Sequence, residues 1–160
     1  LSDLKSIKGR LEWVGTTRTK AGVYVDYAHT PDALAQVLQA LRPHTGNRLY
    51  VVFGCGGNRD KKKRGLMGEI VHRYADTIIV TDDNPRFEDP KSIRQEIIRE
   101  CPRAVEVPNR AQAIQFALDQ LGAGDILLIA GKGHEEGQII GEEIFPHNDK
   151  NSVQKYLNSE

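Results

Sequence analysis

Short apolar runs along the chain alternate with longer amphipathic segments. The first apolar run covers 23–26. Four apolar residues then recur at helical spacing: Leu34, Val37, Leu38 and Leu41. Thr30 can cap a helix, and Pro31 suits the first helical position because its missing N–H would have no partner there. The pattern therefore predicts a strand at 23–26 and a helix from Pro31 to about Leu41.

The same alternation continues to the C-terminus. Apolar and β-branched runs predict further strands at 48–53, 77–81, 104–107 and 125–130. Amphipathic segments predict helices near 66–74, 90–100, 109–121 and 151–157. Two short strand-like pieces around Gly141 indicate a hairpin at 139–145, whereas 15–21 has the polar character of a variable turn. We expect an α/β fold with a mostly parallel sheet of about six strands, helices on both faces and a small C-terminal hairpin.

Length and charge narrow the class of protein. A chain of 160 residues is long enough for one domain with its own core, so we expect a single domain over 1–160. The 22 basic and 22 acidic residues balance, which argues against a nucleic-acid or membrane-surface binder. The first ten residues contain no apolar signal-peptide core. The chain does not begin with Met, so we expect a fragment or a processed form.

Two cysteines, Cys55 and Cys101, are too few for a disulfide framework and are not spaced as metal ligands. This usage is typical of a reducing compartment such as the cytoplasm. We expect Cys101 to be buried at the end of a helix. Cys55 lies in a glycine-rich loop, but the sequence offers it no evident base, so we do not expect a nucleophile there.

Four polar loops follow predicted strands and are the places to look for chemistry. They cover 26–31, 54–64, 81–86 and 130–135. Because the carboxyl ends of parallel strands meet at one edge of a sheet, these loops are expected to converge. Their Asp, Glu, Arg and His side chains would suit a zwitterionic or multiply charged small ligand, each charge meeting a fixed opposite one.

Two common nucleotide motifs are excluded. The glycines of the second loop do not match the dinucleotide fingerprint, because its third glycine would fall at Arg59. Gly131-Lys132-Gly133 lacks the upstream glycine and the following Ser or Thr of a phosphate loop. Taken singly, each loop also has an ordinary explanation: Asp26 can hold a turn, and the basic run 61–64 is typical of a solvated helix start.

Together and in this order, the four loops resemble the C-terminal domain of the Mur ligases, in the branch that adds diaminopimelate. The resemblance extends from about Gly9 to the C-terminus. The segments that carry it are 26–34, 52–60, 81–86 and 130–135. Asp83-Asn84-Pro85-Arg86 is similar to the motif by which this branch recognises diaminopimelate. The resemblance implies a Rossmann-like fold, and it implies that the UDP-substrate domain and the central ATPase domain lie outside these residues.

The resemblance also implies a reaction. Such ligases add meso-diaminopimelate to UDP-MurNAc-L-Ala-D-Glu through an acyl phosphate, in cytoplasmic synthesis of peptidoglycan precursors and hence in cell-wall biogenesis, cell shape and cell division. ATP and Mg²⁺ would be held mostly by the missing central domain, so we expect the isolated chain to be inactive. No metal site, nucleic-acid partner or membrane partner is expected within it.

Residue roles follow from the resemblance, position by position. Arg86 resembles the guanidinium that clamps a carboxylate of diaminopimelate, with Arg59 and Asn84 adding contacts. The Gly131 carbonyl and the Glu135 carboxylate would hold the distant ammonium group. Three further residues would face ATP, namely Arg10 toward the terminal phosphates, Asp26 at the ribose and His29 beside the nucleotide. No catalytic residue is assigned, since the position of His134 beside Glu135 is equally explained by loop structure.

Two alternatives stay open. One is a lysine-adding ligase or another Mur-type amide ligase, such as a folylpolyglutamate or cyanophycin synthetase; the Asn84-Pro85-Arg86 run argues against it. The other is a stand-alone module that binds an amino acid or a nucleotide, which predicts tight binding by the isolated chain. A Rossmann oxidoreductase is excluded by the glycine spacing.

Overall fold

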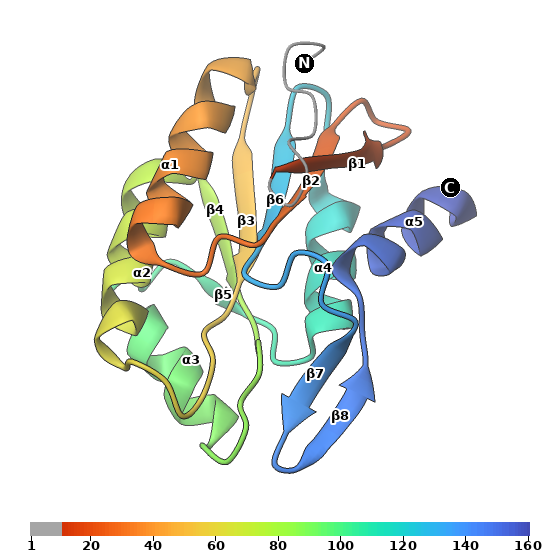
Figure 1. The fold of residues 1–160 in the computed structure, drawn as a ribbon. Helices are drawn as coiled ribbons and strands as arrows, with labels where there is room; N and C mark the ends of the chain where they lie inside the picture. The colour runs from red at the N-terminus through yellow and green to blue at the C-terminus, as the bar shows by residue number, and fades with distance from the viewer. Residues whose placement is uncertain (1–10) are drawn as a thin grey trace.

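A six-stranded sheet forms the centre of the computed structural model, which describes residues 11–160 (Figure 1). Its strands are β1 (Glu12–Thr16), β2 (Gly22–Asp26), β3 (Leu49–Phe53), β4 (Thr77–Val80), β5 (Val105–Glu106) and β6 (Ile126–Ala130). Their order across the sheet is β1-β2-β6-β3-β4-β5. β1 pairs with β2 in the antiparallel direction, and every other pairing is parallel. The mostly parallel sheet of the α/β prediction is confirmed.

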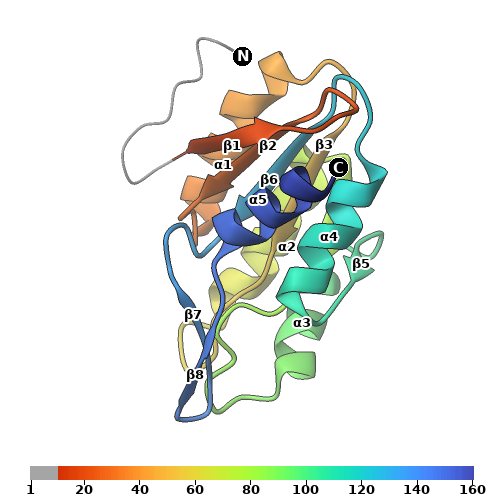
Figure 2. The same ribbon diagram turned by 90° about the vertical axis from the view of Figure 1, so that its right-hand side faces the viewer.

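Helices cover both faces of this sheet, as expected (Figure 2). One layer contains α1 (Pro31–Leu41), the short 3₁₀ helix η1 (Arg42–His44), α2 (Lys62–Tyr74) and α3 (Pro90–Ile98). The other layer contains α4 (Arg110–Gln120) and α5 (Asp149–Ser159). None of the helices within residues 11–160 combines the length and apolar character needed to cross a membrane.

Two apolar cores fill the spaces between the sheet and the helix layers. β3 is buried along its whole length, and its residues alternate between the two cores. Val51 and Phe53 pack on the side of α1, α2 and α3, whereas Tyr50 and Val52 pack on the side of α4 and α5. Burial on both faces explains why this strand is a continuous apolar run rather than an alternating one.

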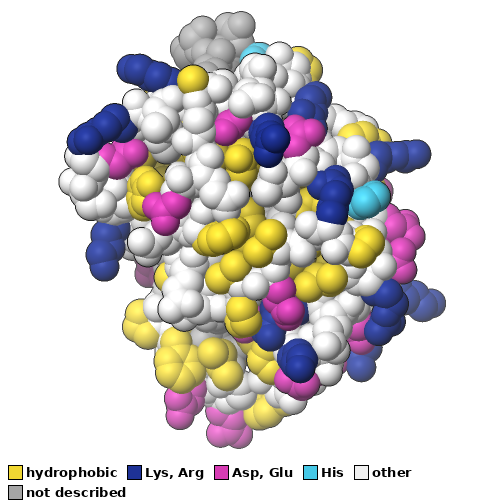
Figure 3. All heavy atoms as spheres, turned by 180° about the vertical axis from the view of Figure 1, so that it is seen from behind, with side chains coloured by type: hydrophobic (Ala, Val, Ile, Leu, Met, Phe, Trp, Pro, Cys, Tyr) yellow, Lys and Arg dark blue, Asp and Glu magenta, His cyan; other side chains and the backbone are white. Residues whose placement is uncertain are grey.

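A small hairpin of β7 (Gly137–Ile140) and β8 (Glu143–Pro146) projects from the end of the molecule near the carboxyl ends of the strands (Figure 1). The predicted turn at Gly141 is confirmed, with φ of 60°. The Arg86 N–H donates to the Ile139 carbonyl at 3.0 Å, and the Gly141 N–H donates to the Arg86 carbonyl at 2.7 Å. Apolar side chains gather around this end of the molecule when it is seen from behind (Figure 3).

Several predicted boundaries were wrong. Gly15 and Thr16 were expected to lie in a variable turn, but they belong to β1. This edge strand is stabilised by its bonds to β2 rather than by its own weak apolar pattern. α2 begins at Lys62 rather than near 66, because the Asp60 carboxylate accepts the Lys62 N–H at 2.9 Å. α5 begins at Asp149 rather than near 151, with Asn148 as its N-cap.

Candidate functional site

A cleft of about 480 Å³ opens at the carboxyl ends of β2, β3, β4 and β6. All four polar loops contribute to its walls, so the predicted convergence is confirmed. Six of the residues singled out from the sequence line it: His29, Arg59, Asn84, Arg86, Gly131 and Glu135. Cationic and anionic side chains share the walls, because Lys63, Asp60 and Asp83 also line the cleft. This mixture suits a ligand with charges of both signs.

The glycine loop after β3 lies directly against the loop after β4. The Gly57 N–H donates to the Asn84 carbonyl at 2.7 Å. A Cβ at Gly57 would lie 1.8 Å from the Pro85 carbonyl oxygen, so no other residue fits without moving the backbone. A Cβ at Gly56 would lie 2.8 Å from Arg86 Nη1. These glycines therefore permit close packing of the two loops rather than a dinucleotide-binding turn.

Arg86 is held at the wall of the cleft by its backbone and its side chain. Its φ is 53°, in the left-handed region that non-glycine residues seldom adopt. The two backbone bonds to the hairpin stabilise this conformation. Arg86 Nη1 donates to the Gly57 carbonyl at 2.9 Å, which braces the guanidinium between the two loops.

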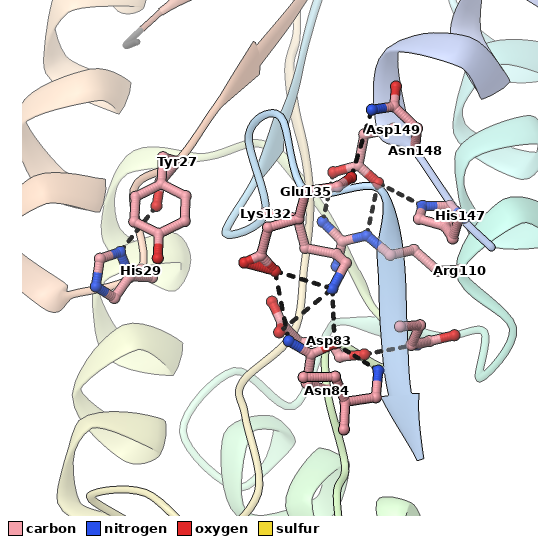
Figure 4. A network of polar contacts seen from close by, with 12 residues as sticks. Tyr27, His29, Asp83, Asn84, Arg110, Lys132, Glu135, His147, Asn148 and Asp149 are labelled. Atoms are coloured by element: carbon pink, nitrogen blue, oxygen red, sulfur yellow. Dashed lines mark hydrogen bonds and ion pairs between the residues drawn. The ribbon is translucent and has the colours of Figure 1, made fainter. Parts of the chain in front are cut away.

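Asn84 and Glu135 are joined by a buried lysine (Figure 4). Lys132 Nζ donates to Asn84 Oδ1 at 2.7 Å and to Glu135 Oε1 at 3.2 Å. Asn84 Nδ2 donates to the same Glu135 oxygen at 3.4 Å. Sequence reasoning considered Lys132 only as part of an unmatched phosphate loop and missed this contact. The available signal was a lysine two residues after a buried strand, between two glycines.

Arg64 ties the glycine loop to the segment after Arg86. The run 61–64 was predicted to be a solvated helix start, and for Arg64 this was wrong because the residue is 1% exposed. Its guanidinium donates to the Gly56 carbonyl at 2.9 Å and also to Glu88. Glu88 Oε2 in turn accepts the Asn58 N–H at 2.9 Å. The hydrogen bond from Arg64, followed by that from Asn58, lowers the pKa of Glu88 from 4.5 to about 2.

Glu88→Gln is expected to reduce the acid sensitivity of the fold. Because the folded pKa of Glu88 lies below its unfolded value, its stabilising contribution is complete above pH 4.5 and is lost as the pH falls toward about 2. The free energy of unfolding should therefore change less between pH 4.5 and 2 in Glu88→Gln than in the wild type, measured by urea denaturation. Glu142→Gln, in the exposed hairpin turn, is the control. If the free energy of unfolding changes equally with pH in the wild type and in Glu88→Gln, the prediction is wrong.

A second buried ion pair joins α4 to α5 (Figure 4). Arg110 and Asp149 form two hydrogen bonds of 2.8 Å, and both side chains are almost inaccessible to solvent. Arg110 Nη2 also donates to the Ala130 carbonyl at 3.0 Å. His147 Nε2 lies 2.7 Å from Asp149 Oδ1. Burial alone would raise the pKa of Asp149, but Arg110 and then His147 hold it well below its usual range.

This ion pair joins the end of β6 to the first turns of α4 and α5, and so supports the loop that begins at Gly131. The sequence did not reveal it. The two partners are 39 residues apart, and each looks like an ordinary polar residue near a helix start.

Cys55 and His134 have no catalytic features in the structure. Burial raises the pKa of the Cys55 thiol to about 12, which is the opposite of what a nucleophile needs. Cys101 is buried, as predicted. The His134 side chain is 64% exposed, and its Nδ1 lies 3.7 Å from Glu12 Oε2.

The residues expected to face ATP are only partly brought together. His29 lies at the cleft, where its ring packs edge-on against the Tyr27 ring with 4.5 Å between the ring centroids. Asp26 is buried at the end of β2 and is not among the cleft-lining residues; its carboxylate accepts the Ala28 N–H at 2.8 Å. Arg10 lies outside the described residues. Within residues 11–160, no group of three His, Cys, Asp or Glu side chains could hold a metal ion.

Comparison with known proteins gives consistent matches. The family described as "Mur ligase, glutamate ligase domain" matches residues 9–133. The UDP-N-acetylmuramoyl-L-alanyl-D-glutamate–2,6-diaminopimelate ligase of Rhizobium meliloti is 55% identical over 98% of this chain and 32% of its own length. A solved structure of a ligase of the same name has a TM-score of 0.89 and 40% identity, over 98% of this chain and 33% of that one.

A UDP-N-acetylmuramate–alanine ligase from Thermotoga maritima shares the fold at lower similarity. Its TM-score is 0.63 at 18% identity, over 100% of this chain and 32% of that one. The chain thus spans about a third of the length of the relatives that it matches.

Proposed function

The chain belongs to the Mur ligase family, as its glutamate ligase domain, and from this premise we propose that it is the amino-acid-binding domain of a diaminopimelate-adding ligase. The complete enzyme would join meso-diaminopimelate to UDP-MurNAc-L-Ala-D-Glu at the expense of ATP, in cytoplasmic peptidoglycan synthesis. One observation supports this most directly. The five residues predicted to bind diaminopimelate come from three separate loops and line one cleft: Arg59, Asn84, Arg86, Gly131 and Glu135.

The charges of the cleft match those of diaminopimelate. Arg86 would pair with a carboxylate, and its planar guanidinium can donate two parallel hydrogen bonds to such a group. Arg59 and the Asn84 amide would add donors on the same side. Glu135 and the Gly131 carbonyl would accept from an ammonium group of the same ligand. Lysine lacks the second carboxylate, so a lysine complex would leave the Arg86 guanidinium without its anionic partner.

The proposed contribution of this domain to catalysis is positioning. Bound ATP supplies the activation of the peptide carboxylate, and this domain would hold the incoming amine where it can attack. His29 and Asp26 remain the predicted nucleotide-facing residues of the described chain. We propose that most ATP and Mg²⁺ contacts come from parts of the enzyme that these 160 residues do not contain.

A titration tests the proposed ligand. The ¹⁵N-labelled chain is titrated with meso-diaminopimelate and, separately, with L-lysine, and backbone amide shifts are followed by NMR. We expect weak, selective binding of diaminopimelate, with shifts at the cleft residues Arg59, Asn84, Arg86, Gly131 and Glu135. Equal binding of lysine would show that the assigned selectivity is wrong. If neither ligand binds, the titration is repeated with the full-length ligase, and failure there would refute the proposed ligand.

A further inference from the structure

Lys132 is the most deeply buried cation at the cleft. Its side chain is 0% exposed, although it comes from a loop that borders an open cavity. A buried ammonium is costly unless oxygen atoms surround it. Here Nζ lies 2.7 Å from Asn84 Oδ1, 3.2 Å from Glu135 Oε1 and 3.9 Å from Asp83 Oδ1. Two of these partners are residues that the proposed function places against diaminopimelate, whereas Lys132 is not among the residues lining the cleft.

The contact with Lys132 fixes which way the Asn84 amide faces. Asn84 Oδ1 accepts from Lys132 Nζ at 2.7 Å and from the Ile139 N–H at 2.9 Å. Rotating the amide by 180° would place its NH₂ group against these two donors, so the rotated form is excluded while both donors are present. Asn84 can therefore present only its NH₂ group on the opposite side, toward Glu135. One hydrogen of this NH₂ group points to Glu135, and the other can be donated to a ligand acceptor such as a carboxylate.

Lys132 also makes the two carboxylate oxygens of Glu135 different from each other. Oε1 accepts from Lys132 Nζ at 3.2 Å and from Asn84 Nδ2 at 3.4 Å. Both donors lie on one side of the carboxylate, which directs Oε2 to a different contact. The Glu135 side chain is 36% exposed and lines the cleft, so its carboxylate can also accept from a cation there.

We propose that Lys132 is a positioning residue for amino-acid recognition. Without touching the ligand, its ammonium locks Asn84 as a donor and orients Glu135 as an acceptor, and this sets where a carboxylate and an ammonium group bind. The inference deepens the proposed function and rests on it for the identity of the ligand. The locking of Asn84 itself is a property of the unliganded chain and can be measured there.

The first test therefore uses the chain without ligand. In the wild type, a hydrogen bond from Lys132 should give a slowly exchanging ammonium signal and a scalar coupling between Lys132 ¹⁵Nζ and Asn84 ¹³Cγ. Lys132→Met keeps the length of the side chain and removes the charge, so the Asn84 side-chain NH₂ signals should shift and broaden. Lys155→Met, on the exposed surface of α5, is the matched control and should leave them unchanged. If the wild-type coupling is absent, or the Asn84 signals are the same in Lys132→Met, the inference is wrong.

The second test measures binding. Lys132→Met should weaken binding of meso-diaminopimelate by about 10- to 100-fold, since one charge-assisted hydrogen bond to the recognition residues is lost. Lys155→Met should bind like the wild type. If the wild-type chain binds no diaminopimelate, the wild type and Lys132→Met are compared as full-length ligases. Absence of binding there by the wild type, with the Asn84 coupling present, would refute the proposed ligand and leave only the hydrogen bond from Lys132 to Asn84 established. If Lys132→Met folds and binds diaminopimelate as tightly as the wild type, the positioning role is refuted. If this variant does not fold, the scalar coupling between Lys132 and Asn84 in the wild type is the deciding measurement, and its absence refutes the positioning role.

Discussion

Arg86→Ala is expected to weaken binding of meso-diaminopimelate by about 100-fold and to leave binding of L-lysine nearly unchanged. Two charge-assisted hydrogen bonds from a guanidinium to a carboxylate are lost for diaminopimelate, whereas lysine has no group at that position. The ratio of the two dissociation constants, from calorimetry or NMR titration, is the quantity to compare. Arg86→Lys should recover only part of the affinity, because an ammonium cannot form the paired bonds of the planar guanidinium.

The backbone of Arg86 requires its own control. Its φ of 53° is unfavourable for Ala, so Arg86→Ala alone combines loss of the guanidinium with local strain. Arg86→Gly relieves the strain and should bind diaminopimelate as poorly as Arg86→Ala. Arg73→Ala, on the helix α2 away from the cleft-lining residues, should behave like the wild type. Equal loss of lysine and diaminopimelate binding in Arg86→Gly would show that Arg86 does not determine selectivity.

Asp149→Ala is expected to lower the free energy of unfolding by about 3–5 kcal/mol, because it leaves the buried Arg110 guanidinium without its anionic partner. Both side chains are at most 1% exposed, so water cannot replace the lost carboxylate without opening the core. Chemical denaturation followed by circular dichroism measures this change. Loss of the pair should also loosen the Gly131 loop, since Arg110 bonds the Ala130 carbonyl directly before it.

Two further variants distinguish the effect of an unpaired buried charge from the effect of losing side-chain atoms. Lys150→Met removes the neighbouring, partly exposed ion pair with Glu12 and should cost less than about 1 kcal/mol. The double variant Arg110→Met/Asp149→Leu removes both charges together and should recover most of the stability lost in Asp149→Ala. A double variant as unstable as Asp149→Ala would contradict the prediction, because the instability would then not come from an unpaired buried charge.

The sequence was sufficient for features that depend on local pattern. Pro31 after Thr30 marked the start of α1, and the continuous apolar run of β3 marked a strand buried on both faces. The order of strands and polar loops was enough to place Arg59, Asn84 and Arg86 at one edge of the sheet, since parallel strands end together. Weakly patterned β1 was missed because its stability comes from pairing with β2.

Only the tertiary structure decided how the polar residues are paired. Arg64 looked like one of four solvated cations, and it became a buried link to Glu88 because α2 begins earlier than its apolar pattern indicates. Lys132 and Asn84, 48 residues apart, meet because β4 and β6 end on the same side of the sheet. Local propensity acts over a few neighbouring residues, whereas a buried charge depends on whichever distant oxygen the fold brings within 3 Å of it. The amino-acid sequence thus determined the architecture and the location of the cleft, and three-dimensional packing decided which residues hold its walls in place.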